Sequence, residues 1–170
     1  VRYFGNIASF GLSGVTDRMF NQMTFATRFS GRFAFKWGML KAMLRYRSKQ
    51  VRIQVDDVYD KTSSVCMAAI CNGQSFGSGM WIAPNAVPDD GLFDVVLVTD
   101  VGPINLLWNI NSIYKGEHLA NKHVTVVRGR KVIATPVDGA GEVLLDVDGE
   151  TPGVLPATFE IMPGAIQFRY

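Results

Sequence analysis

Asn72–Asp94, NGQSFGSGMWIAPNAVPDDGLFD, packs several turn and loop signals into one short stretch. Asn72-Gly73 is a tight-turn dipeptide, because both residue types tolerate positive φ. It follows the apolar run Val65–Cys71 and precedes a second apolar run, Met80–Ala83. This arrangement predicts a β-hairpin that turns at Asn72-Gly73.

The second half of the stretch predicts a stiff acidic loop. Pro84 and Pro88 restrict the backbone, and the acidic pair Asp89-Asp90 follows directly before Gly91. The chain then resumes as an apolar, strand-like run at Leu92–Val98. A rigid loop with adjacent carboxylates is suited to holding a hard cation or a charged partner.

Short β-strands are expected along most of the remaining chain. Val1–Phe10 is apolar enough for a first strand, and Val51–Val55 alternates as a half-buried strand should. Further strands are expected at 124–127, 132–135, 143–147, 158–161 and 166–168, separated by Gly and Pro turns. This spacing predicts an antiparallel β-sandwich or barrel.

Two helices are expected between the first strand and Val51. Ser13 or Thr16 could cap a helix to about Phe29, and Arg32–Arg47 predicts a second. One face of the second helix carries the apolar residues Phe33, Trp37, Leu40 and Leu44. With its basic borders, this face fits either the protein core or a membrane surface. The predicted fold is therefore mainly β with helices (α+β), with a helical insertion after the first strand.

Composition and charge set limits on the class of protein. The 170 residues, 48% of them hydrophobic, suit one domain over 1–170, without an apolar run long enough to span a bilayer or a visible signal peptide. Cys66 and Cys71 fall on opposite faces of one strand, which favours a reducing, cytoplasmic setting. The start at Val1 suggests a fragment or a processed chain.

Basic residues are concentrated near the start of the chain. Residues 1–52 hold ten Lys or Arg and one acid, whereas the remainder holds seven basic and fourteen acidic residues. The two parts could neutralise each other on packing, or the basic part could face anionic lipid or nucleotide phosphate. Nucleic-acid binding is not expected, because acids dominate the β part.

The motifs together resemble the C-terminal half of the diacylglycerol kinase catalytic-domain family, which includes sphingosine and ceramide kinases and bacterial soluble lipid kinases. The matching motifs are Asn6 to Gly11, Asn72-Gly73, Gly77 to Met80, Ala83 to Ala86, Asp90-Gly91 and Gly116 to His118. The resemblance covers nearly the whole chain. It implies a C-terminal β-sandwich that binds the lipid substrate. His118 and His123 show no metal-ligand spacing and are expected to be ordinary turn or surface residues.

A second acidic motif, Asp146 to Glu150, also matches the family's Asp-Gly-Glu. In phosphoryl transfer, one carboxylate can orient or deprotonate the attacking hydroxyl and another can hold Mg²⁺ against ATP oxygens. The resemblance implies that Glu150 is the base and that Asp148 orients the hydroxyl or the nucleotide–magnesium complex. Taken alone, the motif would more simply be an acidic turn in solvent.

The resemblance also implies a structural Mg²⁺ site at the acidic loop. Its ligands would be the Asp90 carboxylate and the backbone carbonyls of Val87 and Leu92. Asp89 is a spare acid in the same loop. One carboxylate supplemented by water is a normal environment for Mg²⁺.

Complete members of the family carry an N-terminal α/β domain with a Gly-Gly-Asp-Gly-Thr phosphate loop, and this sequence contains no such loop. ATP would be bound mostly by that missing nucleotide-binding domain, so this chain alone is expected to be a poor kinase or none. The favoured function is the substrate-binding half of an ATP-dependent lipid kinase acting on a diacylglycerol or sphingoid-like hydroxyl. The alternative is a non-catalytic, metal-stabilised β-sandwich that binds lipid. The related nicotinamide-nucleotide kinases rank lower, because their signatures are not visible.

Overall fold

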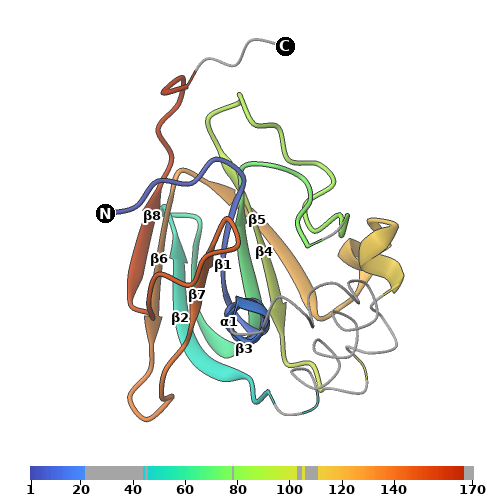
Figure 1. The fold of residues 1–170 in the computed structure, drawn as a ribbon, viewed down its shortest axis with the longest axis vertical. Coiled ribbons are helices and arrows are strands. Elements are labelled where there is room, and N and C mark those ends of the chain that lie inside the picture. Colours follow the sequence, from blue (N-terminus) through green and yellow to red (C-terminus); the bar gives the residue numbers. More distant parts are fainter. Residues whose placement is uncertain (22–43, 45, 78, 103–104, 106–110, 167–170) are drawn as a thin grey trace.

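A computed structural model describes residues 1–21, 44, 46–77, 79–102, 105 and 111–166 (Figure 1). The elements are β1 (Ile7–Gly11), α1 (Leu12–Asn21), β2 (Lys49–Val55), β3 (Tyr59–Cys71), β4 (Phe93–Thr99), the 3₁₀ helix η1 (Glu117–Ala120), β5 (Val124–Gly129), β6 (Lys131–Pro136), β7 (Leu145–Val147) and β8 (Ala157–Glu160). The prediction of a mainly β, antiparallel fold with a helix after the first strand is confirmed.

The long strand β3 organises the sheet. Its first half pairs with β2, and its second half pairs with both β1 and β4. The strand order is β5-β4-β3-β2-β6-β8, and β1 joins β3 to β7 outside this path. Because β1 and β2 share one edge of β3, the sheet divides there into two branches. In the second branch, β1 lies between the second half of β3 and β7.

The main core draws on both branches. It contains the buried side chains of Phe10, Ile53, Ile70, Leu97 and Val132, among others. Full burial of such a side chain contributes roughly 1.5–3 kcal/mol. Alternate residues of β1 and β4 point to the opposite face, where smaller apolar clusters form. This outer face also carries the polar groups of the candidate site.

The predicted hairpin at Asn72-Gly73 is wrong. Met80–Ala83 forms no strand, and Met80 makes only an isolated bridge with Phe76. The amides of Asn72 and Gly73 instead donate to the carbonyl of Asn6, at 2.9 and 3.0 Å. Both edges of β3 are already occupied by β1 and β4, so the segment between β3 and β4 becomes a long loop.

Other boundaries also differ from the predictions. The helix α1 begins immediately after β1, so Ser13 and Thr16 lie inside it rather than at its cap. Most of the predicted helix 32–47 and of the strand 166–168 lies outside the described residues. No described helix is long and apolar enough to cross a bilayer.

Helix α1 packs on the outer face, against β1, β3 and β7. Leu12 forms a small buried cluster with Cys66 and Val98. Gly14 lies directly against the backbone of Leu144, just before β7. The absence of a side chain at Gly14 lets the helix approach this closely.

We predict that Gly14→Ala lowers the melting temperature, although alanine usually stabilises a helix by about 1 kcal/mol relative to glycine. A Cβ at Gly14 would lie 2.4 Å from the carbonyl oxygen of Leu144 and 2.7 Å from its carbonyl carbon. Such overpacking costs roughly 1–3 kcal/mol. Gly153→Ala is the control, because an added Cβ there meets nothing within 4 Å. An unchanged or raised melting temperature for Gly14→Ala would contradict this packing.

Candidate functional site

The Asp-Gly-Glu motif forms a tight turn at the end of β7. The amide of Val147 donates to the carbonyl of Glu150 at 2.8 Å, and the amide of Glu150 donates back at 3.1 Å. Asp148 and Gly149 occupy the centre with φ values of 50° and 87°. Positive φ at both central residues is what a tight two-residue hairpin turn favours, and Asp-Gly supplies it at little cost.

Asp148 ties this turn to the segment that leads into β1. Its carboxylate accepts the backbone amides of Gly5, Asn6 and Ile7 at 2.8, 3.2 and 2.9 Å. Its own amide donates to the carbonyl of Ile7 at 3.1 Å. The carboxylate is thus committed to three backbone donors. Its predicted role toward hydroxyl or nucleotide stays a prediction, whereas its positioning of the turn is visible directly.

Glu150 projects from the turn toward solvent. Its side chain is 71% exposed and lies 2.6 Å from Nη1 of Arg2, which is also largely exposed. Exposed ion pairs of this kind typically contribute only about 0–1 kcal/mol. A polar ligand can therefore replace Arg2 at little cost.

A buried network of hydrogen-bonded polar side chains holds the Asp146–Glu150 turn in place. Asp146 is 3% exposed, and its carboxylate accepts the amide of Gly149 at 2.8 Å and the hydroxyl of Ser9 at 2.9 Å. Ser9 is hydrogen-bonded in turn to Ser13 of α1, at 2.8 Å. Asn21, at the end of the same helix, donates to the carbonyl of Gly149 at 3.1 Å. The amide and the carbonyl of Gly149 are therefore held by side chains from β7 and α1, respectively.

Asp17 of α1 adds a second carboxyl group to this network. Burial, the charge of Asp146 and a hydrogen bond with Asp146 raise the pKa of Asp17 from 3.8 to about 7. Burial also raises the pKa of Asp146, although the hydrogen bonds from Ser9 and Asp17 oppose that shift. Burial and the proximity of the two carboxyl groups therefore favour one bound proton in the Asp17–Asp146 pair at pH values where a free aspartate is ionised.

The two asparagine motifs meet beside the turn. Asn6 donates its side-chain amide to the carbonyl of Ser75 at 3.1 Å, and Asn72 donates its own to the carbonyl of Gly5 at 2.9 Å. Gly73 fits against Asn6 because it lacks a side chain, since a Cβ would lie 2.1 Å from Asn6 Oδ1. Three motifs that are distant in sequence thus converge on residues 5–7.

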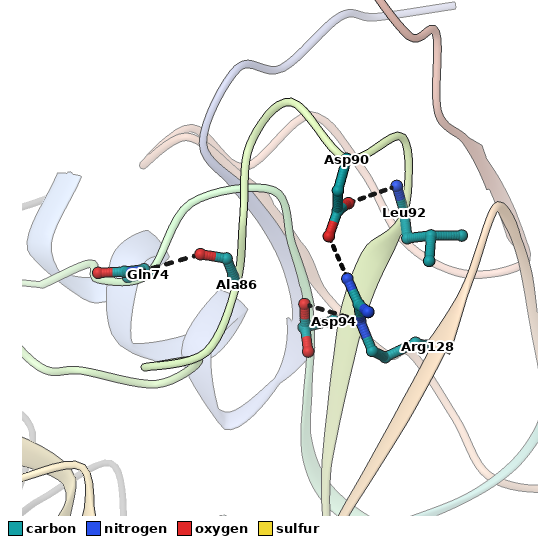
Figure 2. A network of polar contacts seen from close by, with 6 residues as sticks. All are labelled: Gln74, Ala86, Asp90, Leu92, Asp94 and Arg128. Atoms are coloured by element: carbon teal, nitrogen blue, oxygen red, sulfur yellow. Dashed lines mark hydrogen bonds and ion pairs between the residues drawn. The ribbon is translucent and has the colours of Figure 1, made fainter.

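The predicted metal ligands lie in the loop before β4. One Asp90 oxygen accepts the amide of Leu92 at 2.9 Å, and the other forms an ion pair with Arg128 of β5 (Figure 2). The carbonyl of Val87 accepts the amide of Asp90 at 3.3 Å. Arg128 also lies 3.5 Å from Asp94. The assignment of a Mg²⁺ ion to Asp90, Val87 and Leu92 stays a prediction. Both oxygens of the Asp90 carboxylate already have protein partners.

The expectation that His118 is a turn or surface residue is wrong. His118 is 4% exposed, and its Nε2 lies 2.9 Å from the carbonyl of Ile82, to which it donates. Burial lowers the pKa of His118, which favours the neutral ring. The residue therefore joins η1 to the loop between β3 and β4.

Four polar residues of this region did not emerge as candidates from the sequence: Ser9, Asp17, Asp94 and Arg128. Two of them leave a sequence signal. Asp17 is the only acid in the strongly basic first 52 residues, and Asp94 interrupts an otherwise apolar strand. Arg128 leaves none, because its partner Asp90 lies 38 positions away.

Comparison with known proteins finds diacylglycerol kinases and a YegS-like lipid kinase among the relatives of this chain. A diacylglycerol kinase of Mycobacterium tuberculosis is 28% identical over 166 residues, which cover 98% of this chain and 52% of the relative. A probable YegS-like lipid kinase of Shewanella frigidimarina is 31% identical over 104 residues, covering 61% of this chain and 32% of the relative. The crystal structure of a putative diacylglycerol kinase from Bacillus anthracis matches with a TM-score of 0.69 at 20% identity, covering 95% of this chain and 50% of that one.

These matches and the antiparallel fold define a β-sandwich domain of lipid-kinase type. Residues 6–169 match the family described as the YegS C-terminal NAD kinase beta sandwich-like domain, and the chain belongs to that family. The chain spans about half the length of the diacylglycerol kinases it matches.

We predict that the stability contributed by Asp17 falls as pH rises from about 4 to 7. The folded-state pKa of about 7 exceeds the ordinary value of 3.8, so in this window the folded protein holds a proton that the unfolded chain has released. Asp17→Asn keeps a donor toward Asp146 but does not titrate. Melting temperatures between pH 4 and pH 8 should therefore fall more steeply in the wild type than in the variant.

Asp57→Asn, which removes an exposed carboxylate from the turn after β2, is the control and should keep the wild-type slope. Parallel pH profiles for the wild type and Asp17→Asn would show that the proposed shared proton does not exist.

Proposed function

We propose that this chain is the substrate-binding half of an ATP-dependent lipid kinase. The full-length enzyme transfers the γ-phosphoryl group of ATP to the hydroxyl of a diacylglycerol or sphingoid-like lipid. Family membership and the diacylglycerol kinase relatives support the reaction class. The observation that carries the proposal is the exposed Glu150 carboxylate on a turn fixed by buried Asp146 and by Asp148.

In this proposal, Glu150 accepts the proton of the lipid hydroxyl as its oxygen attacks the phosphoryl group. Phosphoryl transfer depends mainly on positioning and on charge stabilisation, so a firmly held turn matters as much as the base itself. Asp146 and Asp148 act as positioning residues. The weak Arg2 ion pair yields to the incoming hydroxyl. Mg²⁺ bound to ATP would neutralise phosphate charge, and an N-terminal nucleotide-binding domain would provide most of the ATP site.

The remaining partners follow from the same proposal. The lipid substrate resides in a membrane, so a cytoplasmic protein of this kind meets the bilayer at its periphery. Its own N-terminal domain would approach through the segment before β1, which Asp148 anchors. One observation favours the alternative of a non-catalytic lipid-binding module, namely that Asp148 is fully engaged by backbone donors.

We predict that Glu150→Gln in the full-length protein lowers turnover on the lipid substrate by roughly 10²–10⁴-fold, the usual effect of losing a general base. The substitution keeps the shape of the side chain but removes its charge. Because the side chain is exposed, the melting temperature and lipid binding should change little. Glu160→Gln is the matched control, since Glu160 is also exposed and paired, with Lys131 at 2.6 Å.

Near-normal turnover of Glu150→Gln would remove Glu150 from the mechanism. A wild-type protein that binds lipid vesicles but phosphorylates neither diacylglycerol nor sphingosine would favour the binding module. Phosphate transfer and vesicle co-sedimentation, measured on the same preparations, separate these outcomes.

A further inference from the structure

Arg128 reaches two carboxylates from neighbouring parts of the chain. Its Nη2 is paired with Asp90 in the loop before β4, and its Nε lies 3.5 Å from Asp94 in β4 (Figure 2). The Arg128 side chain is 45% exposed, Asp90 is 26% exposed and Asp94 is only 6% exposed. The guanidinium therefore covers the buried carboxylate and the edge of the loop.

The fold itself places Arg128 there. Asp94 and Arg128 are directly opposite each other in the β4–β5 ladder, so their side chains share one face of the sheet. Phe93 and Val95 point into the main core on the other face. The loop at Asp90 is shaped independently, by the hydrogen bond from the amide of Leu92. Strand register and loop shape bring all three charges together.

The two carboxylates need a positive charge between them. The Asp94 side chain is only 6% exposed, and a buried carboxylate is costly unless an opposite charge faces it, as Arg128 does at 3.5 Å. Within the described residues, Oδ2 of Asp94 makes no hydrogen bond. Arg128 is thus the compensating group for a nearly buried carboxylate.

A divalent cation could supply the same charge, but the arrangement does not fit a preformed magnesium site. Mg²⁺ requires near-octahedral oxygen ligands at about 2.0–2.1 Å and dehydrates reluctantly. The Asp90 carboxylate instead faces a guanidinium and an amide. Arg128 is also fixed on the strand next to β4, so its effective concentration at the Asp90 carboxylate is high. A free ion must compete with it for that carboxylate.

We propose that Arg128 is the resident cation of the Asp90 loop, so that this loop keeps its shape without a divalent metal. Binding of Mg²⁺ at Asp90, Val87 and Leu92 then requires displacement of Arg128. The guanidinium of Arg128 takes the place of the structural Mg²⁺ ion that the family resemblance implies.

The test compares the full-length wild type with Arg128→Met, without nucleotide, in chelator and in saturating Mg²⁺. Melting temperature and the hydrogen exchange of amides 87–94 report on stability and on the loop. The wild type should show the same values in both conditions. Arg128→Met should melt about 5 °C lower in chelator, exchange faster at the loop and recover at least half of the loss in Mg²⁺. Arg130→Met removes a nearby exposed positive charge and should show neither effect.

Direct metal binding gives a second readout, with Mn²⁺ followed by electron paramagnetic resonance. Arg128→Met should bind one more Mn²⁺ ion than the wild type, and Asp90→Asn in that background should abolish the additional site. Where Arg128→Met does not fold, Arg128→Lys keeps one charge and should fold with a smaller Mg²⁺ response. Stabilisation of wild-type amides 87–94 by Mg²⁺, or an unchanged Arg128→Met in chelator, would overturn the proposal.

Discussion

The Asp148 carboxylate is the constraint on which the candidate site depends. It accepts three consecutive backbone amides, from Gly5 to Ile7. Hydrogen bonds to a charged acceptor are stronger than those between neutral groups. They fix where the chain enters β1, and the pairing of β1 with β3 and β7 follows from that entry. A single side chain thus links the start of the described chain to the turn that presents Glu150.

The two faces of the sheet carry different residues: one face forms the main apolar core, and the other carries the polar groups of the candidate site. Residues of β1 and β4 that point inward are apolar and seal the main core. The residues between them point outward, and they include Ser9 and Asp94. The buried carboxyl group of Asp146 and the bridge made by Arg128 lie on this outer face because the strand period of two places them there. Asp146 accepts a hydrogen bond from Ser9 of the neighbouring strand β1, and Asp94 faces Arg128 of the neighbouring strand β5.

The sequence predicted the strand content and the motifs better than their connections. The turn at Asp146–Glu150 and the strand predicted at Leu92–Val98 follow from local residue chemistry, and both are present in the structure. The prediction of a hairpin at Asn72-Gly73 was wrong because local turn chemistry does not reveal that β1 and β4 occupy the two edges of β3. The Asp17–Asp146 pair and the Arg128 bridge could not be predicted from spacing, since strand register and helix packing create them.

Carboxylates in the turn hold the entry to β1 in place. Hydrogen exchange of the individual amides of Gly5, Asn6, Ile7 and Gly149 measures this most directly, because each donates to Asp148 or Asp146. All four amides should exchange far more slowly than in an unfolded peptide of the same sequence, although Gly5 and Asn6 are exposed. Exchange of Gly5 and Asn6 at the unfolded rate would contradict it.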